Sequence, residues 1–256
     1  TATSAASTSV TDPSLPGISV SMNFESFEIL KRTSTASIAT LLFKRGLRNQ
    51  FIQGVARLNP EHERMVGPVF TLRYIPARED LNPMSVFQDP GHPQRRAVEE
   101  TPEGHVLVMD CRRDATAASA GSILATRMQV RGCAGIVTDG GLRDADDIRA
   151  LDMPAFCAHP SAPTNLTKHQ ALDVNVPIGC GTVAVFPGDI AVGDGDGVII
   201  IPAEIADEIA SEAADMEECE AWVIEQVKGG ASIIGLYPAN DETRARFEAS
   251  RAQKED

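Results

Sequence analysis

The chain has 256 residues, of which 43% are hydrophobic and only 5% aromatic, and its formal net charge is -13. This composition predicts one large domain or two small ones with a core of Val, Ile, Leu and Ala, as in α/β proteins with buried strands. A surface this acidic repels the phosphates of nucleic acids and anionic membranes, so we expect neither as a partner, whereas a small anionic substrate is not excluded.

The N-terminal part is predicted to hold an arm, a helix and a strand. Residues 1–25 lack a basic region followed by an apolar core, so we expect a flexible arm rather than a secretory signal. From Phe27 to about Gln53 the pattern is helical, with an N-cap in Thr33-Ser34-Thr35 and a stop at Gly46. The apolar residues 67–75 predict a buried strand.

The next segment, 76–105, contains five prolines and many charged residues. A loop this long in a compact domain is usually functional or mobile. We interpret it as a lid or an arm between subunits, with an ordinary surface loop as the alternative. Its Arg95 and Arg96 could reshape a neighbouring pocket for a larger or more acidic substrate.

The rest of the chain alternates between strand and helix patterns. A long helix is predicted near the end, and the other expected elements are strands at 105–110, 133–139, 153–159 and several within 176–202, and helices at 114–132 and 205–228. This alternation predicts a single α/β layered domain over 26–240, followed by a charged tail at 241–256. The Asp-Gly-Asp-Gly run at 194–197 lacks the glutamate of a calcium loop, so a turn between two core strands is favoured.

The five cysteines are odd in number and show no C-x-x-C spacing, since they stand at 111, 133, 157, 180 and 219. We expect them to be reduced packing residues of a cytoplasmic protein. No apolar run is long enough to predict a membrane-spanning helix.

The glycine-led segment Gly121-Ser122-Ile123-Leu124 is one candidate for ligand binding. If the regular helix begins near Gly121, the amides of these residues are among its free N–H groups, which attract carboxylate or phosphate. A glycine also permits a ligand to approach the backbone closely. The alternative is a packing glycine inside one continuous helix over 114–132.

The segment VTDGGLRD, residues 137–144, is the second candidate. A buried strand runs into Asp139, two glycines turn the chain, and Arg143 and Asp144 emerge at the end of the strand where ligands of α/β proteins gather. Arg143 can bind a carboxylate through two parallel hydrogen bonds, and Asp144 offers a hard oxygen ligand for Mg²⁺ or Mn²⁺. A surface ion pair between the two is the alternative.

Together with VTDGGLRD, the segments AGSILATRMQVRGCAGI (120–136), FPGDIAVGDGDGVIIIP (186–202) and VGPVFTLR (66–73) resemble a known family. It comprises the proteins related to regulator of ribonuclease activity A, including the class II pyruvate aldolases that cleave 4-hydroxy-4-methyl-2-oxoglutarate and 4-carboxy-4-hydroxy-2-oxoadipate. The resemblance covers about residues 30–230. It implies a three-layer α/β/α swivelling-domain fold, phosphohistidine-domain-like, with 76–105 as a long insertion. It also implies a homotrimer or homohexamer with sites near the subunit interfaces.

The resemblance also implies roles for individual residues. Asp144 would bind the divalent metal, Mg²⁺ or Mn²⁺, in part through water, and Arg143 would hold the 2-oxo acid and stabilise its enolate. The substrate carboxylate would be bound by backbone amides of Gly121, Ser122, Ile123 and Leu124.

Ser122 is a departure from the family pattern. Residues 123–142 separate it from Arg143, a spacing of twenty that places Ser122 where the aldolases have an Asp that positions a water for proton transfer. A serine can bind that water but is a poor base at neutral pH. A variant pattern in the family carries another acid after Arg-Asp, which here is Asp147. The alternative for Asp147 is an acid favoured by the helix dipole.

The sequence therefore predicts a metal-dependent lyase that cleaves a carbon–carbon bond of a small 2-oxo acid, by retro-aldol cleavage to pyruvate or by oxaloacetate decarboxylation. Arg143, Asp147 and Ser122 are its candidate catalytic residues. One alternative is a regulatory protein that binds a ribonuclease without catalysis. Another is a sugar-acid dehydratase or a related lyase on the same metal site.

Overall fold

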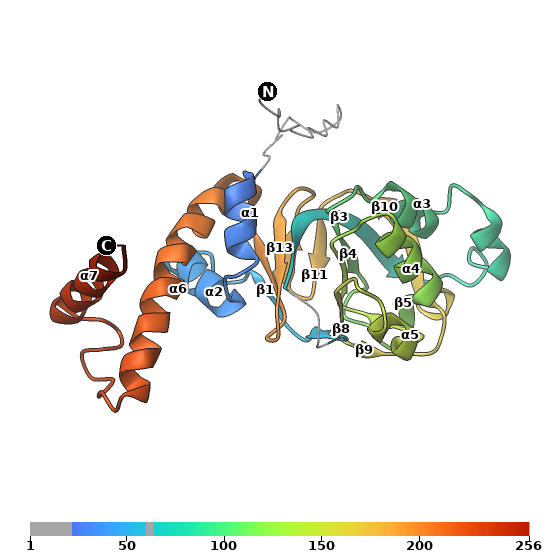
Figure 1. The fold of residues 1–256 in the computed structure, drawn as a ribbon. Coiled ribbons are helices and arrows are strands. Elements are labelled where there is room, and N and C mark those ends of the chain that lie inside the picture. Colours follow the sequence, from blue (N-terminus) through green and yellow to red (C-terminus); the bar gives the residue numbers. More distant parts are fainter. Residues whose placement is uncertain (1–21, 60–63, 256) are drawn as a thin grey trace, which may run out of the picture.

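The computed structural model describes residues 22–59 and 64–255 of the chain, arranged around a mixed β-sheet (Figure 1). The α-helices are α1 (Phe24–Leu30), α2 (Thr35–Lys44), α3 (Pro93–Glu100), α4 (Ser122–Val130), α5 (Ala145–Arg149), α6 (Ala206–Lys228) and α7 (Asp241–Glu255). Short 3-10 helices are η1 (Met84–Gln88), η2 (Asn165–Thr167) and η3 (Ala203–Ile205). The strands are β1 (Phe51–Ile52), β2 (Ala56–Arg57), β3 (Met65–Pro76), β4 (Val106–Asp110), β5 (Ala118–Ala120), β6 (Gly135–Thr138), β7 (Gly141–Leu142), β8 (Ala155–Cys157), β9 (His159–Pro160), β10 (His169–Val174), β11 (Ile178–Cys180), β12 (Val183–Val185), β13 (Ile190–Gly193) and β14 (Val198–Ile201).

The main sheet has nine strands in the order β1-β14-β13-β3-β4-β6-β8-β2, and β10 also pairs with β3. Its centre, β3-β4-β6-β8, is parallel, and the outer pairings are antiparallel. One hydrophobic core contains Val198 of β14 and Phe156 of β8, which lie far apart in this order. The sheet is therefore curled around that core, which the β11–β12 hairpin also enters.

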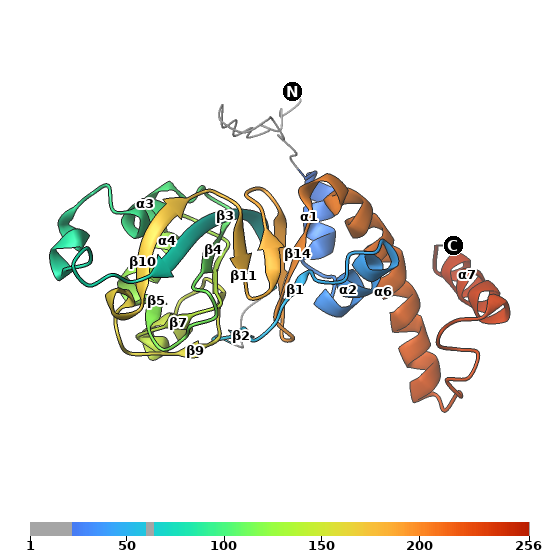
Figure 2. The ribbon, with the colours of Figure 1, turned by 180° about the vertical axis from the view of Figure 1, so that it is seen from behind.

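Helices cover the outside of the curled sheet at its two ends. Figures 1 and 2 show α1, α2 and α6 beside β13 and β14, and α3, α4 and α5 at the opposite end. The first group packs on Ile190, Val192 and Ile199, and the second packs on Leu107 and Ile136. The α/β class predicted from the sequence is confirmed, while the narrower swivelling-domain label stays a prediction.

The N-terminal helical region is interrupted, because α1 and α2 are separate helices. The Ser34 side chain accepts a hydrogen bond from the Ser37 amide and so caps α2, as predicted. Gly46 follows α2 with a φ of +84°, which glycine adopts without strain and which ends the helix. Residues 1–21 of the predicted arm lie outside the described residues, and α1 begins at Phe24, inside that arm.

Two other predicted elements differ from the structure. The segment 76–105 is not a continuous loop, because it contains η1 and α3, and Pro93 stands in the first turn of α3, where a missing N–H costs nothing. Residues 114–132 do not form one helix, because Ala118–Ala120 pair with another strand and α4 begins only at Ser122.

The C-terminal part contains two helices, α6 and α7, joined by a non-helical segment at 229–240. The predicted helix is α6, but the charged tail forms a further helix, α7, which packs back on α6 through Trp222 and Phe247, whose ring centroids lie 5.9 Å apart. None of the described helices is long and apolar enough to cross a membrane. All five cysteines are free, and four of them are buried, as expected of packing residues.

The buried carboxyl of Asp189, at the start of β13, predicts a pH-dependent stability. Burial raises its pKa from 3.8 to about 6 although its Oδ2 accepts a hydrogen bond from the Phe186 amide. A carboxyl with a raised folded-state pKa binds more protons in the folded state, so its contribution to stability is lost as the pH rises from about 4 to about 6. At about 1.4 kcal/mol per pKa unit, the stability lost over this pH range amounts to about 2–3 kcal/mol.

Asp189→Asn keeps an acceptor for the Phe186 amide and removes the titration. We expect its free energy of unfolding, measured by urea denaturation at several pH values, to gain about 2–3 kcal/mol relative to the natural protein between pH 4 and pH 6. Parallel pH profiles of the two proteins would contradict this assignment.

Candidate active site

The register of a small parallel sheet brings the two candidate segments together. β5 pairs with β7, with Ala120 opposite Leu142, and the Arg143 amide donates a hydrogen bond to the Ala120 carbonyl at 3.1 Å. The next residues along each strand, Gly121 and Arg143, are therefore neighbours. This pairing joins segments that stand about twenty residues apart in the sequence.

Asp144 is held at the start of α5 by contacts with Ser122. Its φ of +57° is a left-handed conformation that Asp tolerates better than most residues. Its Oδ2 accepts hydrogen bonds from the Ser122 amide at 3.1 Å and the Ser122 hydroxyl at 3.3 Å, and lies 3.6 Å from Nε of Arg143. Both side chains of the Arg-Asp pair are about 40% exposed, so they are open to a ligand.

Gly121 is required by the space beside Arg143 and Asp144. A Cβ at this position would lie 2.6 Å from Oδ2 of Asp144 and 2.8 Å from Nε of Arg143, closer than real Cβ contacts allow. Gly121 is also the N-cap of α4, so the first amides of that helix have no intrahelical partner. The backbone at the start of α4, the Asp144 carboxylate and the Arg143 guanidinium thus lie next to one another.

A cavity of about 120 Å³ opens at this point of convergence. Its wall includes the predicted residues Gly121, Ile123, Leu124, Arg143 and Asp144. The other residues of the wall come from three segments, namely Phe87, Gln94 and Arg95, then Ala118, Ser119 and Ala120, then Thr164 and Asn165.

The strand end that leads to this site is fixed by the buried carboxylate of Asp139. Its Oδ1 accepts a hydrogen bond from the Cys111 amide at 2.6 Å, and its Oδ2 accepts from the amides of Arg113 and Gly181, each at 2.9 Å. Burial raises the pKa of Asp139 against the effect of these donors. Asp139 therefore ties three loops together and does not line the cavity.

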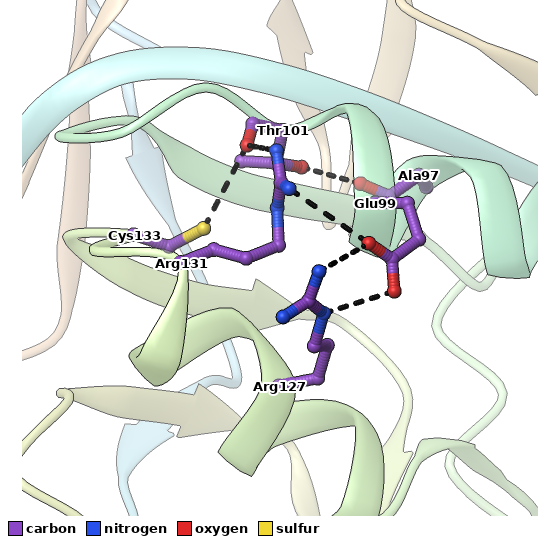
Figure 3. Close-up of polar contacts among 6 residues, drawn as sticks. All are labelled: Ala97, Glu99, Thr101, Arg127, Arg131 and Cys133. Carbon is purple, nitrogen blue, oxygen red and sulfur yellow. Dashed lines mark hydrogen bonds and ion pairs between the residues drawn. The ribbon is translucent and has the colours of Figure 1, made fainter.

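The segment that contributes Phe87, Gln94 and Arg95 is anchored through α3. The Glu99 carboxylate of α3 binds Arg127 of α4 at 2.8 Å and lies 3.7 Å from Nη1 of Arg131 (Figure 3). On the inner side, the Gln94 amide donates to the Ser119 carbonyl. The cavity wall formed by α3 is therefore attached to α4 and β5.

The sequence of this chain matches the model of one known protein family. The model of the RraA-like family, described as Aldolase/RraA, matches residues 35–200, which contain the whole Gly121 to Asp144 region. The chain belongs to the RraA-like family. This confirms the resemblance seen in the sequence.

Individual RraA-like proteins are related to the chain at moderate identity. A relative from Halalkalibacterium halodurans, provisionally named a 4-hydroxy-4-methyl-2-oxoglutarate aldolase, is 34% identical over 142 residues, which are 56% of this chain and 61% of that protein. The chain thus spans less than two thirds of the length of that relative. A second relative with the same provisional name, from Ectopseudomonas mendocina, is 36% identical over 41% of this chain and 64% of its own length.

Two solved structures share the fold. Streptomyces coelicolor RraAS2, described as an unusual member of the RNase ES inhibitor RraA family, is 30% identical with a TM-score of 0.68, covering 78% of this chain and 96% of its own. An uncharacterised protein from Pseudomonas syringae is 24% identical with a TM-score of 0.72, covering 84% and 98% of the two chains, and it supports the fold alone.

The site of this RraA-like chain differs in part from the predicted one. Ser122 binds Asp144 but is not among the residues of the cavity wall. Asp147 is exposed on α5 and also lies outside the wall, and among the described residues its carboxylate has no hydrogen bond or ion pair. Their catalytic roles stay predictions.

Sequence reasoning did not single out Phe87, Gln94, Thr164 or Asn165. Phe87 and Gln94 lie in the proline-rich segment 76–105, which was predicted to be a lid or an arm beside a pocket. That prediction for the whole segment was the available signal. Thr164 and Asn165 follow a Pro-Ser-Ala-Pro turn, a pattern that indicates a loop and no chemistry.

The donor set fits a divalent cation that keeps most of its ligands as water or substrate. Among residues 22–59 and 64–255, no group of three or more His, Cys, Asp and Glu side chains could enclose a metal. Asp144 nevertheless offers a half-exposed carboxylate in the cavity wall, and within the described part of the chain only its Oδ2 accepts hydrogen bonds. Mg²⁺ is commonly held by one or two carboxylates plus substrate oxygens and water.

Proposed function

We propose that the protein is a divalent-metal-dependent lyase that cleaves a carbon–carbon bond of a small 2-oxo acid. The observation that carries this proposal is the convergence of Arg143, Asp144 and the Gly121 end of α4 on one cavity. The provisional aldolase names of the relatives support it.

The first task of the site is to bind the carboxylate and 2-oxo group of the substrate. The amides of Ile123 and Leu124 in the first turn of α4 offer hydrogen bonds and a partial positive charge to the carboxylate, whereas the Ser122 amide already donates to Asp144. Arg143 carries a planar guanidinium that can donate two hydrogen bonds to substrate oxygens. Because the overall charge of the chain is negative, these groups provide the local positive potential that an anion needs.

The second task is to stabilise the charge that develops when the bond breaks. In a retro-aldol cleavage the 4-hydroxyl loses its proton, the C3–C4 bond breaks, and its electron pair moves onto the 2-oxo group to give the enolate of pyruvate, which is then protonated at C3. Arg143 is placed to share the negative charge of this enolate. A divalent cation held by Asp144 supplies Lewis-acid polarisation of the 2-oxo group.

Ser122 and Asp147 have different parts in this proposal. Ser122 orients the Asp144 carboxylate through its amide and hydroxyl, and it could hold a water without acting as a base. Asp147 is the candidate second acid. A homotrimer or homohexamer, with sites near its interfaces, and a cytoplasmic location are part of the same proposal.

The likeness to RraAS2 supports a second candidate, a regulatory protein that binds a ribonuclease. A ribonuclease activity assay with and without the purified chain separates the two. We favour catalysis, because the Arg-Asp pair of this chain opens into a cavity. Product analysis with sugar acids tests the third candidate, a dehydratase on the same site.

Removal of the metal is expected to abolish turnover. Oxaloacetate decarboxylation and 4-hydroxy-2-oxoglutarate cleavage should require Mg²⁺ or Mn²⁺, fall to the uncatalysed rate with EDTA, and return when metal is added in excess. Asp144→Asn should weaken Mn²⁺ binding, measured by electron paramagnetic resonance, by about 10-fold or more, because a neutral amide is a poor ligand for a hard cation.

Asp146→Asn is the matched control, because Asp146 is an exposed carboxylate two residues away that pairs with Arg149. It should bind Mn²⁺ like the natural protein. Full turnover in EDTA, or equal Mn²⁺ affinity of Asp144→Asn and the natural protein, would refute the metal site.

A further inference from the structure

The cavity wall combines small residues with one large aromatic side chain. Beside Gly121 the wall is formed by Ala118, Ser119 and Ala120, which leave space in front of the backbone. Among the described residues of the wall, Phe87 of η1 supplies the only aromatic ring. The space that a ligand can occupy therefore depends on where that ring lies.

The Phe87 ring is held by two side chains that follow it in the sequence. The Arg95 guanidinium lies over the ring, 4.6 Å from its centroid. The rings of Phe87 and His92 meet in an edge-to-face arrangement, with 5.3 Å between their centroids and 73° between their planes. His92 is buried and stands at the N-cap of α3, so it is a fixed support. Both contacts are favourable for an aromatic ring and oppose its displacement by a ligand.

The segment that carries Phe87 is attached to the rest of the protein on both sides of that residue. Figure 1 shows this segment projecting beyond α3. Before Phe87, the Asn82 side chain donates a hydrogen bond to the Gln170 side chain at 3.0 Å. After it, the buried Gln94 side chain donates to the Ser119 carbonyl. The ring is thus part of the cavity wall in the folded protein and not a loose surface group.

The cavity has room for a small ligand only. Its volume of about 120 Å³ is well below the roughly 300–1,000 Å³ of pockets that hold drug-sized molecules. The 2-oxo acid end of the substrate, bound at Arg143 and Asp144, uses part of this space. Ile123 also belongs to the wall, but it is 79% exposed and can turn to solvent. Phe87, which is held on two sides, is therefore the large apolar side chain that restricts the remaining space.

We propose that Phe87 is a specificity residue that limits the length of the substrate beyond its 2-oxo acid end. The inference rests on the proposed function for the assignment of that end to Arg143. A fixed ring discriminates by its bulk, because a longer ligand must displace it or remain outside. The selected class is short 2-oxo acids, whatever charge their remote end carries.

The test follows affinity along a series of 2-oxo acids that cannot undergo retro-aldol cleavage, namely 2-oxobutanoate, 2-oxohexanoate and 2-oxooctanoate. Dissociation constants are measured by ligand-observed NMR titration with Mg²⁺ present. The natural protein should bind 2-oxobutanoate about 10-fold or more tightly than 2-oxooctanoate, the effect of an overfilled site. Phe87→Ala should reverse this order, because each additional buried methylene then adds up to about 4-fold in affinity.

Two other replacements of Phe87 separate its bulk from its contact with Arg95. Phe87→Leu keeps most of the bulk and removes the aromatic contact, so it should keep the preference for the short acid. Phe87→Trp keeps an aromatic contact and adds bulk, so it should weaken the binding of 2-oxohexanoate further. These two variants also test the proposal if Phe87→Ala does not fold.

Phe43→Ala is the matched control, because Phe43 of α2 also lies beside an arginine. The Arg48 guanidinium is 5.1 Å from the centroid of that ring, and Phe43 is exposed and does not belong to the cavity wall. Its replacement should leave the affinities of all three acids within about 2-fold of the natural values.

The inference is overturned if the natural protein binds the three acids equally or binds none, if Phe87→Ala keeps the natural order, or if Phe87→Leu loses it. Cleavage is measured separately with 4-hydroxy-2-oxopentanoate and 4-hydroxy-2-oxononanoate, which give pyruvate with acetaldehyde or hexanal. A length limit on binding without cleavage of either acid would leave the role of Phe87 standing and refute the lyase. Equal cleavage of both, with no length limit on binding, would do the reverse.

Discussion

Replacement of Arg143 by glutamine is expected to lower kcat for 2-oxo acid cleavage about 100- to 1,000-fold, the effect of removing a positioned donor from a developing oxyanion. Glutamine retains a side-chain amide but loses the charge and the paired donors of the guanidinium. The side chain is 44% exposed, and its Nε lies 3.6 Å from Oδ2 of Asp144, so the fold does not depend on it. The free energy of unfolding should change by less than about 1 kcal/mol.

The matched control is Arg149→Gln, an arginine of α5 that pairs with Asp146 on the surface. It carries the same change of charge and is not part of the cavity wall, so its kcat should stay within about 2-fold of the natural value. Steady-state kinetics with pyruvate detection separate the effects on kcat and KM. Equal kcat for Arg143→Gln and Arg149→Gln would show that Arg143 does not act on the reacting atoms.

The strand and turn of VTDGGLRD could be predicted because their signals are local. A run of apolar residues ending at Asp139 predicts a buried strand, and Gly140 and Gly141 predict a turn. The structure explains the need for Gly140 by space rather than by backbone angle, since a Cβ there would lie 2.6 Å from the Cβ of Cys111. Local pattern therefore placed Arg143 and Asp144 correctly at the end of a strand.

The elements that were predicted wrongly depend on contacts between distant residues. Alanines at 115, 117, 118 and 120 favour a helix by intrinsic propensity, but Ala118–Ala120 pair with β7 instead. The prolines of 76–105 predict a loop, but Pro93 begins α3, and packing of Ala97 and Val98 on the core stabilises that helix. Tertiary packing overrode local preference in both cases.

The cavity itself could not be predicted from the sequence. Its wall joins Phe87, Arg95, Gly121, Arg143 and Asn165, which come from four separate segments with no common periodicity. The unpaired Nδ2 of Asn165 becomes visible only when every neighbour of that atom is known. The sequence could therefore indicate the 2-oxo acid end of the site, and the opposite end needed the structure.

The second large effect is expected from Asp139→Asn, which should lower the free energy of unfolding by about 2–4 kcal/mol. Both oxygens of Asp139 are acceptors, and together they satisfy the amides of Cys111, Arg113 and Gly181. An asparagine has one acceptor oxygen, so its NH₂ group must face at least one of these N–H donors, and each buried unpaired group costs about 1–3 kcal/mol. Removing a buried charge offsets part of this loss.

Urea denaturation measures this effect, with Asp110→Asn as the control. Asp110 ends the neighbouring strand β4 and accepts hydrogen bonds from the amides of Arg112 and Gly179, but it is only half-buried, so its replacement should cost less than about 1 kcal/mol. Equal destabilisation by the two variants would contradict the role of Asp139.

Because Asp139 does not line the cavity, the folded fraction of Asp139→Asn should keep kcat within a few-fold of the natural value. The two acids of VTDGGLRD thus have separable roles: Asp139 stabilises the loops that carry the site, and Asp144, six residues after the strand ends, acts in the chemistry that we propose.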